Sequence, residues 1–148
     1  MLKGAGSGSR TVPVVALMCA LSFQGLSGLA GGVGLMGDPT GTSLRIPQEW
    51  LAGSPFSDYL VPGLILLILL GALPLVVVWG VWAAAPWAWA ASLGIGVMLV
   101  VWIGVQISIV GYQPSPPLQV VYGTLGLGII ALTQFPSVHA YLGRDRSV

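Results

Sequence analysis

The stretch GDPTGTSLRIPQEWLAGSPFSDYLVPG, from Gly37 to Gly63, is the polar segment between the first two long apolar runs of the chain. It holds four of the eleven prolines and four of the nine charged side chains, which are Asp38, Arg45, Glu49 and Asp58. Charged and turn-forming residues gathered between apolar runs indicate a structured loop in water, flanked by segments that lie in lipid. Specific contacts are therefore expected in this loop.

The composition supports a lipid environment. Of 148 residues, 55% are hydrophobic and 6% are charged, whereas soluble domains are about 25% charged. So few charges could not cover a water-soluble surface, and the length allows one domain. The net charge of +1 offers no basic stripe for nucleic acid, and the single cysteine, Cys19, allows no internal disulfide.

Four apolar runs are long enough to cross a bilayer, which takes about 20 helical residues. We predict an all-α membrane protein: a four-transmembrane-helix bundle with a structured extracytoplasmic loop between its first two helices. The predicted segments are spans at about 11–36, 59–82, 87–110 and 118–135, an outer loop at 37–58 and a cytoplasmic tail at 136–148. Pro74 removes a backbone donor inside the second span, which predicts a kink near Leu70.

The first apolar run has competing interpretations. A basic start, an apolar core and a possible cleavage site at Ser27–Ala30 (SGLA) also fit a cleaved signal peptide. The run continues past that point to Met36, which favours an uncleaved helix. A lipoprotein site at Cys19 is disfavoured because the bulky Met18 precedes it.

Three local patterns are expected in the loop. Asp38–Gly41 has turn chemistry in which Asp38 bonds its own backbone. Pro47 begins a short helix ending at Ala52. Ser54 is expected to cap a helix that has Asp58 in its first turn and runs into the second span.

The cations predict the orientation. Four spans place both termini on one side, and the loop side holds only Arg45; the tails hold Lys3, Arg10, Arg144 and Arg146. The positive-inside bias therefore places both termini in the cytoplasm and the loop outside, although it does not by itself exclude three spans after cleavage. Four of the six tryptophans bracket the second connection, as an interfacial belt would: Trp79, Trp82, Trp87 and Trp89.

Small residues predict how the spans pack. Helices in lipid associate through close contacts of small side chains and through polar bonds. Packing within one chain is favoured over a dimer interface for three ridges: Gly28 with Gly32, Ser92 with Gly96, and Thr124 with Gly128. Gln24, near the middle of the first span, is expected to make an interhelical hydrogen bond.

Catalytic and cofactor chemistry finds little support. No Asp, Glu, Lys or Arg lies inside a predicted span, whereas proton relays and ion-coupled transporters place one there. His139 is the only histidine, so no cofactor and no metal site is predicted. One set of side chains could line an outward-facing pocket or could instead hold the loop onto the bundle as a lid. The set consists of the loop charges Asp38, Arg45, Glu49 and Asp58 together with Trp102, Gln106, Gln119 and Tyr122.

Two further patterns carry a resemblance. The run Gly31–Gly41 (GGVGLMGDPTG) is followed by Ser54-Pro55-Phe56 and by Tyr59–Gly63 (YLVPG). With these motifs the chain resembles an uncharacterised family of small bacterial four-span integral membrane proteins, over about residues 31–136. The resemblance implies a four-span fold in a bacterial plasma membrane and adds no catalytic residue.

Two functions are therefore expected. The first is a non-enzymatic accessory or interaction component, with a membrane-protein partner or a second copy of the chain bound at the loop. The second is binding or transport of a hydrophobic small molecule, such as a lipid or quinone, at Trp102, Gln106, Gln119 and Tyr122. An enzyme is the third choice, because only Asp38, Glu49 and Asp58 could act as acids or bases.

Overall fold

The computed structural model describes residues 9–143, which form helices and turns and contain no β-strand. Lys3, Arg144, Asp145 and Arg146 lie outside the described residues. The long helices are α1 (Val12–Gly37), α4 (Trp87–Val110) and α5 (Leu118–Thr133), and a rod made of α2 (Leu60–Leu67), the π-helical turn η3 (Ile68–Ala72) and α3 (Leu73–Trp82). The shorter elements are the 3-10 turns η1 (Thr42–Leu44) and η2 (Gln48–Leu51) and the helix α6 (Pro136–Leu142).

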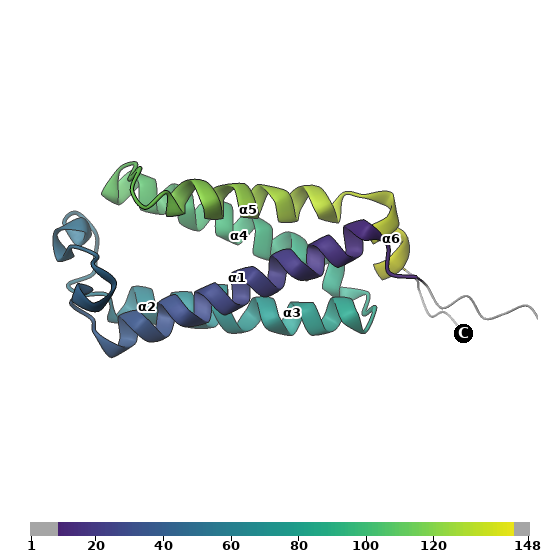
Figure 1. Cartoon of the computed structure of the whole chain (residues 1–148), viewed down its shortest axis with the longest axis horizontal. Coiled ribbons are helices and arrows are strands. Elements are labelled where there is room, and N and C mark those ends of the chain that lie inside the picture. Colours follow the sequence, from purple (N-terminus) through teal and green to yellow (C-terminus); the bar gives the residue numbers. More distant parts are fainter. Residues whose placement is uncertain (1–8, 144–148) are drawn as a thin grey trace, which may run out of the picture.

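The long helices form a bundle whose two ends differ (Figure 1). The chain makes four passes along the bundle, so α1 begins and α5 ends at the end where α6 lies. α1 packs on the α2–α3 rod and on α5, α4 packs on α5 and α3, and α6 touches α1, α4 and α5. α2 does not pack along α4, and at the loop end the α4–α5 hairpin diverges from α1 and α2 (Figure 1).

The helices are compatible with the predicted helical membrane bundle. α1, the α2–α3 rod and α4 are each long and apolar enough to cross a membrane, and a fourth span exists if α5 and α6 are counted together. α5 alone has 16 residues and is about 24 Å long at about 1.5 Å per residue. α6 turns away from it by 69°, because Pro136 cannot continue the helix.

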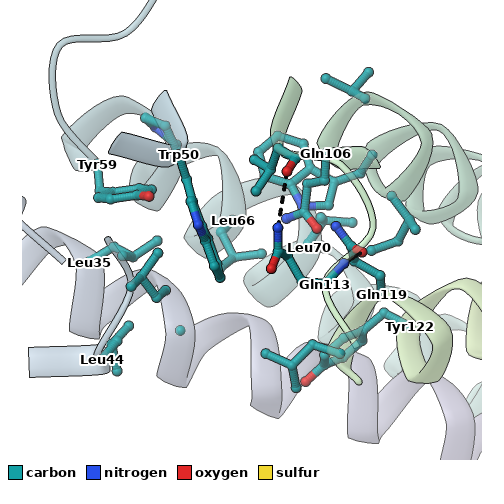
Figure 2. A pocket seen from close by; sticks show the side chains of 18 of the residues that line it. Leu35, Leu44, Trp50, Tyr59, Leu66, Leu70, Gln106, Gln113, Gln119 and Tyr122 are labelled. Carbon is teal, nitrogen blue, oxygen red and sulfur yellow. Dashed lines mark hydrogen bonds between the residues drawn. The ribbon is translucent and has the colours of Figure 1, made fainter. Parts of the chain in front are cut away.

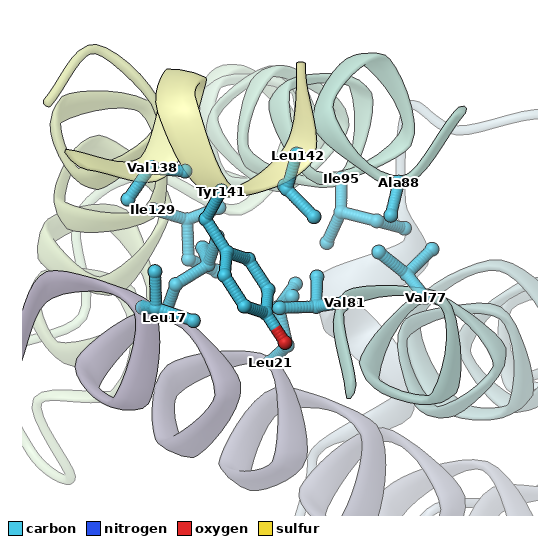
Figure 3. Close-up of a cluster of buried hydrophobic side chains, with 11 residues drawn as sticks. Leu17, Leu21, Val77, Val81, Ala88, Ile95, Ile129, Val138, Tyr141 and Leu142 are labelled. Atoms are coloured by element: carbon cyan, nitrogen blue, oxygen red, sulfur yellow. The ribbon is translucent and has the colours of Figure 1, made fainter. Parts of the chain in front are cut away.

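Residues 136–142, predicted as the first part of a cytoplasmic tail, are folded onto the bundle. They form α6, which buries Val138, Tyr141 and Leu142 in the largest hydrophobic core of the described chain (Figure 3). Leu17 and Leu21 of α1 lie on the opposite side of that core. Burying these apolar side chains away from water holds α6 across the end of the bundle.

The second span is irregular near Pro74, where the sequence predicts a kink. Pro74 has no N–H, so the carbonyl of Leu70 loses its α-helical donor, and the backbone widens into η3 just before it. Nε2 of Gln24 takes the place of that donor and bonds the Leu70 carbonyl oxygen at 3.0 Å. This is an interhelical bond of the kind expected from Gln24, whose Oε1 is buried without a partner among the described residues.

The glycines of α1 allow the close approach that this bond needs. A Cβ added at Gly28 would overlap the backbone carbonyl of Leu70, and a Cβ at Gly32 would lie 2.7 Å from the Cα of Leu67. Backbone cannot move aside as a flexible side chain can. The ridge formed by Gly28 and Gly32 therefore packs within the chain.

The Ser92 and Gly96 ridge packs α4 against α5. Ser92 is buried, and its hydroxyl donates to the Ala88 carbonyl of its own helix at 2.7 Å. A Cβ at Gly96 would lie 3.0 Å from the carbonyl oxygen of Gly126. A small residue is thus required at this crossing.

The third predicted ridge is not a contact within the described chain. Thr124 is exposed, and a Cβ at Gly128 would meet open space. α5 presents Gly126 to α4 instead, where an added Cβ would lie 2.9 Å from Val100. The four-residue spacing of small side chains selected the wrong face of α5, because Gly126 lies two residues, or about 200° around the helix, from both Thr124 and Gly128.

Candidate ligand-binding pocket

Asp38 organises the first half of the loop. Its Oδ1 accepts from the Thr40 hydroxyl at 2.6 Å, and its Oδ2 accepts from the Ser43 hydroxyl at 2.7 Å and the Ser43 N–H at 2.8 Å. These bonds, that of the Thr40 hydroxyl foremost, lower the pKa of Asp38 to about 2. The carboxylate is therefore charged at neutral pH and occupied by its own loop.

Tyr59 ties the two halves of the loop together. Its N–H donates to the Pro39 carbonyl at 2.9 Å and its hydroxyl to the Pro47 carbonyl at 2.7 Å. Its ring lies against Gly41, which has a φ of +79° and no room for a Cβ. Burial raises the pKa of the Tyr59 hydroxyl. Tyr59 is thus the buried anchor of the loop.

The second half of the loop forms no α-helix before α2 begins. Ser54 does not cap a helix as expected: its hydroxyl accepts from the N–H of Phe56 in a turn, and α2 begins only at Leu60. Asp58 accepts from the Leu60 N–H at 3.0 Å, so its carboxylate lies at the helix start, where the dipole favours a negative charge. The expected short helix at residues 47–52 is the 3-10 turn η2.

A cavity of about 450 Å³ lies beneath the loop. Small-molecule sites have volumes of about 300–1,000 Å³. α1 and α2 form one wall, α4 and α5 form the other, and the segment containing η1 and η2 covers it. Leu35, Leu44 and Tyr59 lie on one side of the cavity and Gln106, Gln119 and Tyr122 on the other, with Trp50 of η2 reaching between them (Figure 2). The cavity exists because α2 and α4 do not pack together here.

The floor of the cavity is a small apolar cluster. Leu70 of η3 packs with Leu99 and Ile103 of α4, and Trp102 and Tyr122 pack against this cluster from the α4 and α5 side. The ring of Tyr122 also stacks on Phe23 of α1, with 6.2 Å between ring centroids. Trp102 and Tyr122, both predicted contacts, thus present aromatic surface to the cavity.

The glutamines at the cavity differ in what they bond. Gln119 is buried; its Oε1 accepts from the Gln113 N–H at 2.9 Å and its Nε2 donates to the Gly111 carbonyl at 3.1 Å. The side chain of Gln113 donates to the Val110 carbonyl at 3.1 Å. These amides brace the turn between α4 and α5, and the half-buried Gln106 takes part in none of these bonds. Gln106 is therefore the amide best placed for a ligand.

The charged candidates separate into two groups. Arg45 lines the cavity and is the only charged residue of residues 9–143 that does so. Asp38, Glu49 and Asp58 do not line it. Within the same residues no group of three or more His, Cys, Asp and Glu side chains could hold a metal ion.

Two contributors were missed by the sequence prediction. Neither Trp50 nor Gln113 was predicted to contact a ligand, yet both line the cavity. For Gln113 a signal existed: it follows Gly111 in a turn with three prolines, which donate no N–H, so a side-chain amide is needed to satisfy the carbonyls there.

Comparison of the chain with protein-family models, with curated proteins and with solved structures finds no match. The arguments for function therefore come from the geometry of the chain itself.

Proposed function

We propose that the protein binds a hydrophobic small molecule of the lipid or quinone type in the cavity beneath its loop. One observation supports this most strongly: helices that pack tightly elsewhere leave a cavity of about 450 Å³ here. Apolar and aromatic side chains with a few polar groups are what small-molecule sites use. Among residues 9–143 no acid–base pair lines the cavity, so binding or carriage suits it better than catalysis.

The membrane setting is part of the proposal. We place four spans in a bacterial plasma membrane, with α5 and α6 together as the fourth, both termini in the cytoplasm and the loop outside. The positive-inside bias of the terminal cations supports this orientation, as does the four-pass path of the chain, in which α1 begins at the same end where α6 lies (Figure 1).

Cysteine labelling in intact cells tests the orientation. In a Cys19→Ala background, Ser57→Cys in the loop is expected to react with a membrane-impermeant maleimide. Ser147→Cys in the tail is expected to react only after permeabilisation. The opposite pattern would contradict the proposed orientation.

Native mass spectrometry tests the binding. Protein purified in mild detergent should retain a small molecule, and Leu66→Trp should lose it because Leu66 lines the cavity on α2. Leu64→Trp is the matched control, since Leu64 is exposed on the same helix and is not part of the cavity lining. Gln106→Leu should weaken retention. Wild-type protein that retains nothing, or equal retention by both tryptophan variants, would contradict the proposal.

An accessory role at the loop is the second candidate function. Glu49 lies exposed on η2 and away from the cavity, so a membrane-protein partner could contact it without displacing a ligand. A photo-crosslinking residue at position 49 should capture the same protein repeatedly in intact membranes, whereas the same residue at position 127, on the outer surface of α5, should not. Equal capture from both positions would indicate random collisions.

A further inference from the structure

Helix packing does not close the cavity on every side. α3 packs on α4, whereas α2, which precedes it in the same rod, does not. The gap therefore lies between α2 and α4 in the half of the bundle nearest the loop. Val105 of α4 lines the cavity and is itself exposed, as is Val101 one turn before it, so lipid chains would border this gap.

Within residues 9–143, the only formal charge at the cavity is the positive charge of Arg45. Arg45 belongs to the covering loop, where its backbone is held in the left-handed region at a φ of 55°, directly after η1. Asp38 is bonded to Thr40 and Ser43, Asp58 is bonded to the start of α2, and Glu49 does not line the cavity. An anion at the loop side of the cavity would therefore meet Arg45 without a competing carboxylate from the loop.

The polar and apolar groups of the cavity lie in the order of the parts of a lipid. A cation stands at the loop, the amide of Gln106, which has no partner among residues 9–143, is on the wall, and the apolar floor of Leu70, Leu99 and Ile103 lies deeper. A quinone carbonyl could accept a hydrogen bond from the guanidinium but would leave its charge unpaired, and a soluble anion would leave the apolar floor uncovered. Charge complementarity and the open side together select a membrane amphiphile.

We infer that the occupant is an anionic membrane lipid that reaches the cavity sideways between α2 and α4. Its chain lies on the apolar floor and its acidic headgroup pairs with Arg45. This inference rests on the proposed binding function and narrows it to one chemical class.

The test compares lipids with matched chains. The full-length protein is placed in nanodiscs of equimolar phosphatidylglycerol and phosphatidylcholine, released into the mass spectrometer, and scored for the lipid it keeps. Wild-type protein is expected to favour phosphatidylglycerol about two- to fivefold, the range for one partly exposed ion pair. Arg45→Gln should bring the ratio to about one.

Arg10→Gln is the matched control and should leave the ratio unchanged, because Arg10 lies at the other end of the bundle, where it bonds the Trp82 carbonyl. Equal retention of both lipids by the wild type, or an unchanged preference in Arg45→Gln, would overturn the inference while leaving the binding function intact. Displacement of the lipid by glycerol phosphate alone would overturn it in favour of a soluble anion. A lipid-free dimer would overturn it in favour of a second copy of the chain, and retention of no molecule would overturn the proposed function itself.

Discussion

The two ends of this bundle are built from the same four passes of the chain and differ in how they are filled. At one end α6 covers the bundle, and side chains from α1, α3, α4, α5 and α6 meet without exposure (Figure 3). At the other end α2 and α4 separate, and a loop braced by its own hydrogen bonds covers a cavity (Figure 2). The same helices thus form a closed core at one end and leave a cavity at the other. The open end is therefore a feature of this sequence, and it is the part to explain by function.

The largest expected effect is at the closed end. Leu142→Ala should destabilise the protein by about 2–5 kcal/mol, because it empties a fully buried position. Leu127→Ala, on the exposed face of α5, should cost far less. Thermal unfolding of both variants in detergent measures the difference, and equal losses would mean that the closed end is not the stabilising core.

The next effect is at the boundary between the two ends, where α1 crosses η3. Gly28→Ala should cost about 1–3 kcal/mol, since its Cβ would overlap the Leu70 carbonyl. Gly128→Ala is the control and should be neutral or mildly stabilising, because the added methyl group meets open space. A tolerated Gly28→Ala would contradict the close crossing of α1 and η3.

A smaller effect is expected from the bond that satisfies the π-turn. Gln24→Met removes the donor to the Leu70 carbonyl. The unpartnered Oε1 leaves with the same side chain, so the loss should be near the average for such bonds in lipid, about 0.6 kcal/mol. Gln106→Met, which breaks none of the bonds that brace the α4–α5 turn, should change the unfolding temperature less. A larger effect of Gln106→Met would mean that Gln106 is structural rather than available to a ligand.

The smallest effect concerns the loop. The folded pKa of Asp38 lies at about 2, below its ordinary value of 3.8, so its bonds stabilise the loop above about pH 4 and are lost as the pH falls toward 2. Carboxyl NMR should show this titration directly. Ser43→Ala should move the pKa back toward 3.8, and Ser57→Ala should not; an unshifted pKa in Ser43→Ala would contradict the bonding pattern of the loop.

The sequence predicts the first three long helices well. Apolar runs of bilayer length bounded by Gly, Pro and Asp have few alternatives, and the bounds agree within one or two residues. α6 was not predicted, because a helix of only seven residues beginning at Pro136 has no clear apolar pattern in the sequence. Its apolar face is recognisable only from the core that buries Val138, Tyr141 and Leu142. Thr124 and Gly128 show the converse error, in which spacing alone could not decide which face of α5 meets α4.

The candidate site was predicted in part for a physical reason. Arg45, Trp102, Gln106, Gln119 and Tyr122 line the cavity, because apolar and amide side chains at that depth can only face one another or lipid. The carboxylates of the loop do not line the cavity, because Asp38 and Asp58 accept hydrogen bonds from backbone N–H groups a few residues away. Local hydrogen bonds of this kind compete with any distant role, and sequence alone does not reveal which will prevail.

One measurement tests the contrast between the two ends most directly. A lipid with a photoreactive chain is activated in nanodiscs holding the wild-type protein, and its adducts are mapped by peptide mass spectrometry. We expect adducts at Leu35 and Ile103, which are buried from the outer surface but line the cavity, and none at the buried Leu17 and Ile129 of the closed end. Adducts confined to outward-facing residues such as Val101 and Leu127 would show that lipid never occupies the cavity.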